Sequence, residues 1–213
     1  MDRQQFLNLT HIQEASRDNR LVIFVGAGVS INSGIPSWNS LIDVLKQELP
    51  ADFSSETDAL KIVQVYKDAR GHKEYMDKVK EVLLFNKAVP NPLHKRICSL
   101  SPCHIITTNY DDLIEQELAN EFLQFHVIRE DKDLPQMTFP NTLVKMHGDY
   151  AKDNIVLTES DYFNYKDNFP LIRAFIQSLF ASKLVLFVGF SFADLNLKMI
   201  LNELKNILSE NMQ

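Results

Sequence analysis

Short apolar runs alternate along the chain with longer segments whose apolar residues recur at helical spacing. The runs are rich in Val, Ile and Phe, which is typical of parallel strands buried on both faces of a sheet. The clearest runs predict strands at residues 21–25, 104–108, 142–146 and 183–188, and weaker runs predict strands at 124–128 and 154–157. The pattern therefore predicts an α/β fold with a parallel sheet of about six strands and helices on both faces.

A helix is predicted directly after the first strand. Its apolar side chains fall on one face of a helix and are Leu41, Ile42, Leu45 and Leu49. Either Ser37 or Ser40 is available as the N-cap, and Pro50 ends the helix. The first strand is thus followed by a turn and a helix.

The rest of the chain divides in the same way. Residues 57–85 predict two helices broken near Gly71, inside a small helical insertion at about 52–100. Further helices are predicted at residues 111–119, 170–181 and 194–208, and residues 130–141 are expected to form a surface loop. Residues 1–213 are therefore expected to form a single domain.

Composition narrows the class of protein. The formal net charge of -6 provides no cationic field, so direct binding of DNA or RNA is not expected. The two cysteines, Cys98 and Cys103, are too few for a disulfide framework or for a structural zinc site made of two cysteine pairs. No apolar run approaches the ~18 residues that span a bilayer. We expect a cytoplasmic protein that does not contact a membrane.

Two of the predicted strands end in residues that suit a nucleotide site. Gly26 and Gly28 follow the first strand, where glycine lets the backbone approach a pyrophosphate. The alternative is a simple tight turn. Asn109 and Asp111 follow the strand at 104–108, at the ligand-binding edge of such a sheet, with capping of the next helix as the alternative for either side chain.

Two later strand ends carry further candidates. His147 precedes Gly148 and has a pKa range that suits proton transfer near neutral pH, although a single histidine can also be structural. Gly189 permits close approach of a ligand, and Ser191 is placed to bond a ribose or phosphate oxygen. Ser191 and Asp194 also resemble a capping box for the last helix.

Taken in order, these segments resemble the signatures of the sirtuin (silent information regulator two) family. They read GAGVSINSGIP at 26–36, TTNYD at 107–111, HG at 147–148 and GFS at 189–191. The resemblance implies a Rossmann-like NAD-binding fold in which Asn109 and His147 flank the nicotinamide ribose.

Departures from the deacetylating sirtuins indicate a particular branch. Ser37-Trp38-Asn39 stands where they carry Asp-Phe-Arg, Thr108 replaces a glutamine, and no cysteine follows Cys103 to build their zinc module. The chain resembles instead the sirtuin-like domains of bacterial anti-phage defence proteins, which hydrolyse NAD to nicotinamide and ADP-ribose and are generally fused to a sensor or regulatory region. The resemblance implies NAD⁺ as substrate, no metal, a homo-oligomer, a phage-derived trigger or regulatory partner, and a domain that is either complete or excised from a longer protein.

The resemblance also implies residue roles. Asn109 is expected to orient the ribose or the attacking water, His147 to accept a proton, and Asp111 to hold the ribose or Asn109. The other expected contacts with NAD are made by Gly26, Ala27, Gly28 and Ser30 at the diphosphate, by Gly189 and Ser191 at the adenosine half, by Pro36 and Trp38 at the nicotinamide, and by Thr108. Two alternatives stay open: an NAD-dependent deacylase or ADP-ribosyltransferase, and a non-catalytic module that senses NAD or ADP-ribose.

Overall fold

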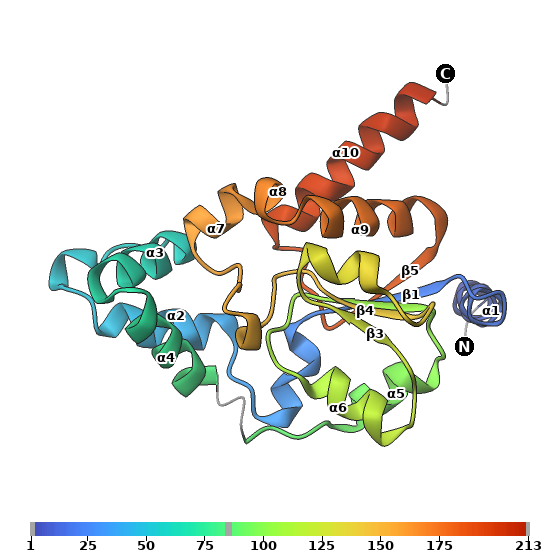
Figure 1. The fold of residues 1–213 in the computed structure, drawn as a ribbon, viewed down its shortest axis with the longest axis horizontal. Coiled ribbons are helices and arrows are strands. Elements are labelled where there is room, and N and C mark those ends of the chain that lie inside the picture. The colour runs from blue at the N-terminus through green and yellow to red at the C-terminus, as the bar shows by residue number, and fades with distance from the viewer. Residues whose placement is uncertain (1–2, 84–86, 212–213) are drawn as a thin grey trace.

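Five parallel strands form the central sheet of the computed structural model, which describes residues 3–83 and 87–211 (Figure 1). They are β1 (Leu21–Val25), β2 (His104–Thr107), β3 (His126–Ile128), β4 (Thr142–Lys145) and β5 (Leu184–Val188), in the spatial order β3-β4-β2-β1-β5. Every neighbouring pair is parallel. The predicted α/β class and its parallel sheet are therefore confirmed, with five strands instead of six.

The sixth predicted strand, at residues 154–157, does not join the sheet. Its side chains are buried, with Val156 and Leu157 at 1% and 0% exposure, which explains its strand-like pattern. Its backbone, however, bonds to the loops at the end of the sheet: the N–H of Val156 donates to the carbonyl of His147 at 2.9 Å, and the hydroxyl of Tyr110 donates to the carbonyl of Val156 at 2.7 Å. The segment is a buried connection because its polar groups are satisfied without a ladder.

Helices cover both faces of the sheet, and the alternation of side chains along β1 shows why. Val22 and Phe24 belong to the core beneath α8 (Tyr165–Asn168), α9 (Pro170–Ser182) and α10 (Leu195–Asn211). Leu21, Ile23 and Val25 belong to the core on the other face, with α1 (Arg3–Arg17), α5 (Pro92–Ser99) and α6 (Leu113–Asn120). In Figure 1 the first set lies above the sheet, and α5 and α6 lie below it. Burial on both faces requires the continuous apolar runs of the strands.

A third apolar cluster holds a separate group of helices at one side of the sheet, which we call the helical lobe. It consists of α2 (Trp38–Gln47), α3 (Ala59–Arg70) and α4 (His72–Leu83), and α7 (Glu159–Phe163) contacts α3. The predicted break at Gly71 is confirmed, and residues 84–86 of the predicted helical stretch lie outside the described residues. The predicted insertion at about 52–100 also contains α5. This helix packs under the sheet, so the lobe consists of α2–α4.

Short 3₁₀ turns complete the chain: η1 (Ala27–Val29), η2 (Ile31–Ser33), η3 (Ala51–Phe53), η4 (Asp131–Gln136) and η5 (Tyr150–Lys152). The predicted surface loop at 130–141 contains η4. Among the described residues, no helix is long and apolar enough to cross a membrane.

Helix starts follow the predictions in part. Ser37 caps α2, since its side chain accepts the N–H of Ser40 at 3.2 Å. The predicted capping box of Ser191 and Asp194 is wrong. Asp194 itself accepts the N–H of Leu197 at 2.8 Å and therefore caps α10 alone. A carboxylate in this position also suits the positive end of the helix.

Candidate active site

The loops that follow β1, β2, β4 and β5 meet at the carboxyl edge of the sheet and line a cavity of about 610 Å³. Most of the predicted site residues line it: Asn109, His147, Asp111, Ala27, Gly28, Ser30, Pro36, Trp38, Thr108, Gly189 and Ser191. Gly26 is the exception: it is buried, and its N–H donates to the carbonyl of Val188 at 3.0 Å. Such a crevice outside the strand ends is where open parallel sheets bind ligands. The helical lobe contributes Trp38 and Leu60 to the lining, together with Asp58, the N-cap of α3.

Asn109 is fixed in one orientation by the loop after β1. Its Nδ2 donates to Ser30 Oγ at 3.0 Å and to the carbonyl of Gly26 at 3.3 Å. Ser30 in turn donates to Asp111 Oδ2 at 2.8 Å, so its hydroxyl oxygen accepts from Asn109. A flipped amide would put Oδ1 against the Gly26 carbonyl, where two acceptors repel each other.

The fixed amide leaves one acceptor without a partner. Oδ1 of Asn109 is buried and makes no hydrogen bond within the protein, and the residue is 7% exposed at the cavity. A buried carbonyl oxygen without a partner is energetically unfavourable, so a site that keeps one is suited to a ligand that donates to it. A ribose hydroxyl and a water molecule are both such donors.

Asp111 combines two functions that the sequence presented as alternatives. Its Oδ1 accepts the N–H of Leu113 at 3.2 Å at the start of α6, and its Oδ2 accepts the Ser30 hydroxyl. The helix begins at Leu113, two residues later than predicted. Asp111 therefore both supports the helix start and holds Ser30 beneath Asn109.

His147 lines the same cavity, and its surroundings are aromatic and acidic. Its ring makes edge-to-face contacts with Tyr162 and Tyr165, at centroid distances of 5.4 and 6.1 Å. Its Nε2 is 3.3 Å from Asp194 Oδ2, although the two are not aligned as a hydrogen bond. Burial lowers the pKa of His147, and the charge of Asp194 raises it, with burial the larger effect. The imidazole is therefore neutral at pH 7, as a proton acceptor requires.

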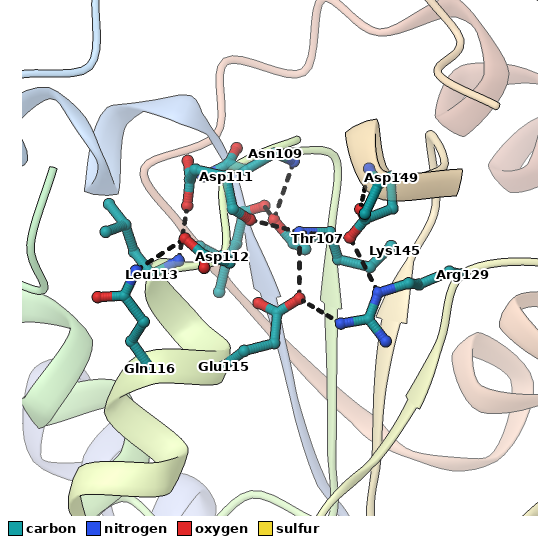
Figure 2. A network of polar contacts seen from close by, with 12 residues as sticks. Thr107, Asn109, Asp111, Asp112, Leu113, Glu115, Gln116, Arg129, Lys145 and Asp149 are labelled. Atoms are coloured by element: carbon teal, nitrogen blue, oxygen red, sulfur yellow. Dashed lines mark hydrogen bonds and ion pairs between the residues drawn. The ribbon is translucent and has the colours of Figure 1, made fainter. Parts of the chain in front are cut away.

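An ionic network centred on the buried Lys145 lies beside Asn109 and Asp111 (Figure 2). Lys145, fully buried at the end of β4, donates to the carbonyl of Asp111 and lies 3.3 Å from Glu115 and 3.7 Å from Asp149. Arg129 joins the two carboxylates, with its Nε 3.0 Å from Asp149 and Nη2 3.4 Å from Glu115. Burial raises the pKa of Glu115 despite the neighbouring cations. Lys145 thus ties the loop carrying Asn109 to the strand that leads to His147.

The glycines after β1 and β5 pack against each other. The N–H of Gly28 donates to the carbonyl of Gly189 at 2.9 Å, and a Cβ on Gly28 would lie 2.8 Å from that oxygen. Gly189 has φ of 64°, a conformation that side chains disfavour. The N–H groups of Val29 and Ser30 are also bonded, to the carbonyls of Gly26 and Ala27. These glycines are thus required by the packing of the two loops, and their contact with a diphosphate stays a prediction.

Gly148 also serves the protein's own backbone. It has φ of 75°, and a Cβ there would lie 2.2 Å from the carbonyl oxygen of Asn154. The side chain of Asn154 accepts the N–H of Asp149 at 2.8 Å and donates to the carbonyl of Arg129 at 2.9 Å. The small residue beside His147 therefore makes room for the buried 154–157 connection.

Residues 103–213 match the model of the family described as SIR2-like domain. The chain belongs to the SIR2-like domain family. The resemblance to sirtuins drawn from the four motifs is therefore confirmed. The family match begins after the loop that follows β1, which carries the first of those motifs.

Several curated relatives resemble this SIR2-like domain over most of its length. It is 35% identical over 208 residues to "Defense-associated sirtuin 2" of Bacillus subtilis, covering 93% of this chain and 20% of that protein. It is 32% identical over 221 residues to "NAD(+) hydrolase ThsA" of Acinetobacter baumannii, covering 99% of this chain and 44% of that protein. An "NAD-dependent protein deacetylase" of Listeria monocytogenes matches 50% of the chain at 32% identity. The chain spans less than half the length of these relatives.

Four further polar residues that line the cavity of the SIR2-like domain are not predicted as site residues by the sequence. They are Asp194, which the sequence pattern presents as a helix cap, and Tyr110, Tyr162 and Asp58, to which the pattern assigns no role. Asp194 follows the last glycine motif directly, which is the one signal that its position offered. Trp38 lines the cavity, as predicted, and also packs on the core of the helical lobe. Among the described residues, no group of three or more His, Cys, Asp and Glu side chains is placed to hold a metal ion.

Proposed function

We propose that this SIR2-like domain hydrolyses NAD⁺ to nicotinamide and ADP-ribose. The observation that carries the proposal is the unpartnered, buried Oδ1 of Asn109 in the same cavity as the buried imidazole of His147. The cavity has the site and size of a nucleotide pocket in a parallel sheet. Relatives named NAD(+) hydrolase ThsA, which align over most of the chain, support the same activity.

The chemistry needs few groups. The bond between the ribose C1′ and the nicotinamide nitrogen breaks, nicotinamide leaves as a neutral molecule, and positive charge develops on the ribose. Water then adds its oxygen to C1′ and loses a proton. Asn109 Oδ1 orients the ribose or this water by accepting a hydrogen bond, and His147 takes up the released proton. Asp111 holds Asn109 through Ser30.

The biological setting is part of the proposal. A relative named Defense-associated sirtuin 2 supports a role as an effector in anti-phage defence. We propose that residues 1–213 act as one catalytic domain in the cytoplasm, as a homo-oligomer that responds to a phage-derived trigger or regulatory partner. The other predicted contacts with NAD, from Gly26, Ala27, Gly28, Pro36, Trp38, Thr108, Gly189 and Ser191, belong to the same proposal.

Incubation of the protein with NAD⁺ tests the activity directly. We expect nicotinamide and ADP-ribose to appear in equal amounts, without any acylated peptide or acceptor protein, when the products are separated by chromatography and identified by mass. Release that depends on an acylated peptide would support the deacylase alternative. Calorimetric binding of NAD⁺ without products, at high protein concentration, would support a sensing module and overturn the proposal.

The charges of the cavity predict its choice between NAD⁺ and NADP⁺. Among the described residues that line it, none is Lys or Arg, whereas three are acidic: Asp58, Asp111 and Asp194. The 2′-phosphate of NADP⁺ adds about two negative charges, which such a cavity disfavours. We expect kcat/KM for NADP⁺ to be at least about 10-fold lower than for NAD⁺, equivalent to roughly 1.4 kcal/mol. Equal values, measured at the same ionic strength, would contradict this reading of the cavity.

A further inference from the structure

The carboxylate of Asp194 is held firmly where it faces His147. Its Oδ1 accepts the N–H of Leu197 at 2.8 Å, and its Oδ2 accepts the hydroxyl of Tyr162 at 3.0 Å. The side chain is 8% exposed and lines the cavity. Asp194 is thus more than a helix cap, since a cap needs only the first of these bonds.

The histidine offers one nitrogen to this carboxylate. Nε2 of His147 is buried, 3.3 Å from Asp194 Oδ2, and has no hydrogen-bond partner in the protein. Catalytic hydrogen bonds are commonly long or poorly aligned before the substrate binds. A proton on Nε2 satisfies both groups, and the second ring nitrogen is then unprotonated. The remaining ionisable groups around the ring, Tyr162 on α7 and Tyr165 on α8, stay neutral because burial raises the pKa of both phenols.

We propose that Asp194 is a positioning residue for His147: its carboxylate keeps the proton on Nε2 and leaves Nδ1 as the atom that accepts a proton during the reaction. When Nδ1 takes up the proton, the imidazolium that forms is stabilised by the adjacent negative charge, as in other His–Asp pairs. Tyr162 supports the arrangement by holding Asp194 Oδ2. The catalytic part of this inference rests on the proposed hydrolysis of NAD⁺, whereas the pairing of Asp194 with His147 does not.

The variant Asp194→Asn removes the charge and keeps the cap. Asparagine is as good an N-cap as aspartate, so the midpoint of thermal unfolding is expected to change by only a few degrees. Asp194→Ala removes both the charge and the cap, and the loss of a cap costs about 1 kcal/mol. If activity falls only in Asp194→Ala, in step with stability, Asp194 is merely a cap and the proposal is overturned.

Nuclear magnetic resonance of the histidine rings tests the pairing without any substrate. The signals of His147 are assigned by their loss in His147→Gln. We expect the neutral ring of the wild type to carry its proton on Nε2, and its pKa to fall by about one unit or more in Asp194→Asn. An unchanged tautomer and pKa in the variant would overturn the proposal. This result does not depend on turnover. A wild type that fails to hydrolyse NAD⁺ would therefore contradict the proposed function but not the pairing of Asp194 with His147.

Kinetics tests the catalytic consequence. We expect kcat for nicotinamide release to fall by about 10-fold to 100-fold in Asp194→Asn, with KM for NAD⁺ nearly unchanged. The base acts in its neutral form, so the rate rises as the pH increases through the pKa of His147. Because the variant lowers that pKa, the acidic limb of the pH profile moves to lower pH while the plateau falls. A fall in rate without this movement would contradict the proposal.

The two tyrosines provide a matched pair of variants. Both rings pack edge-to-face on His147, but only Tyr162 donates to Asp194. Tyr162→Phe is expected to move the acidic limb of the pH profile, because Asp194 Oδ2 loses its donor. Tyr165→Phe removes a hydroxyl that has no hydrogen-bond partner and is expected to leave the limb in place. An equal movement in both variants, or in neither, would count against Asp194 as the group that acts on His147.

Discussion

Asn109→Ala is expected to lower kcat for nicotinamide release by about 10²-fold or more, because the reacting ribose or water loses the group that orients it. His147→Ala is expected to lower it by about 10² to 10⁴-fold, the range for the loss of a general base. Neither side chain is a large part of the apolar core, so both variants are expected to fold. The rates are measured by chromatography at saturating NAD⁺, with circular dichroism to confirm the fold.

A matched control separates this effect from a general loss of asparagine. Asn39 lies exposed on α2 and outside the cavity lining, so Asn39→Ala is expected to keep the wild-type rate.

The unpartnered Oδ1 of Asn109 also leads to a prediction about stability. Removing this oxygen relieves an unfavourable buried acceptor. Asn109→Ala should therefore lose less stability than the same substitution at a buried asparagine whose oxygen is hydrogen-bonded. A wild-type kcat in Asn109→Ala would show that its Oδ1 does not face the reacting atoms.

The sheet was predictable because central parallel strands are apolar along their whole length. Residues 21–25 match β1 at both ends. The same signal gave a wrong prediction at 154–157, because an apolar run shows that residues are buried but not that they pair with a strand. Val156 is buried, yet its N–H donates to the carbonyl of His147. The helix α1 escaped prediction for the opposite reason. Most of its residues are exposed and only Ala15 is fully buried, so it has little apolar periodicity.

The sequence predicts which strand ends form the site. Parallel strands bring their carboxyl ends to one edge, so the spacing of motifs places Asn109 and His147 on the same cavity. The sequence does not say which loop side chains turn toward each other. Asp194 therefore looked like a cap, and its approach to His147 depends on how α10 packs on the sheet. Lys145 falls within a predicted strand, and the pattern does not indicate that its side chain is fully buried among charged groups.

Lys145→Met is expected to lower the free energy of unfolding by about 3–5 kcal/mol at pH 7 to 8, the cost of removing one partner from a buried ion pair. The variant keeps the apolar stem but leaves Glu115 and Asp149 to face Arg129 alone and frees the carbonyl of Asp111. Urea unfolding followed by circular dichroism measures the loss. The matched control is Lys132→Met. The side chain of Lys132 is 72% exposed, so its ion pair with Glu130 is worth at most about 1 kcal/mol.

The dependence of this loss on pH identifies its electrostatic origin. Burial already raises the pKa of Glu115, and removal of Lys145 raises it further. An acid whose pKa is raised by folding contributes stability below its unfolded pKa and loses that contribution as the pH rises through its folded pKa. The deficit of Lys145→Met relative to the wild type should therefore be largest at neutral pH and shrink on acidification, as Glu115 takes up a proton. A deficit that stays constant from pH 8 to pH 5 would mean that Lys145 stabilises the fold by packing, and that the loop of Asn109 does not depend on its charge.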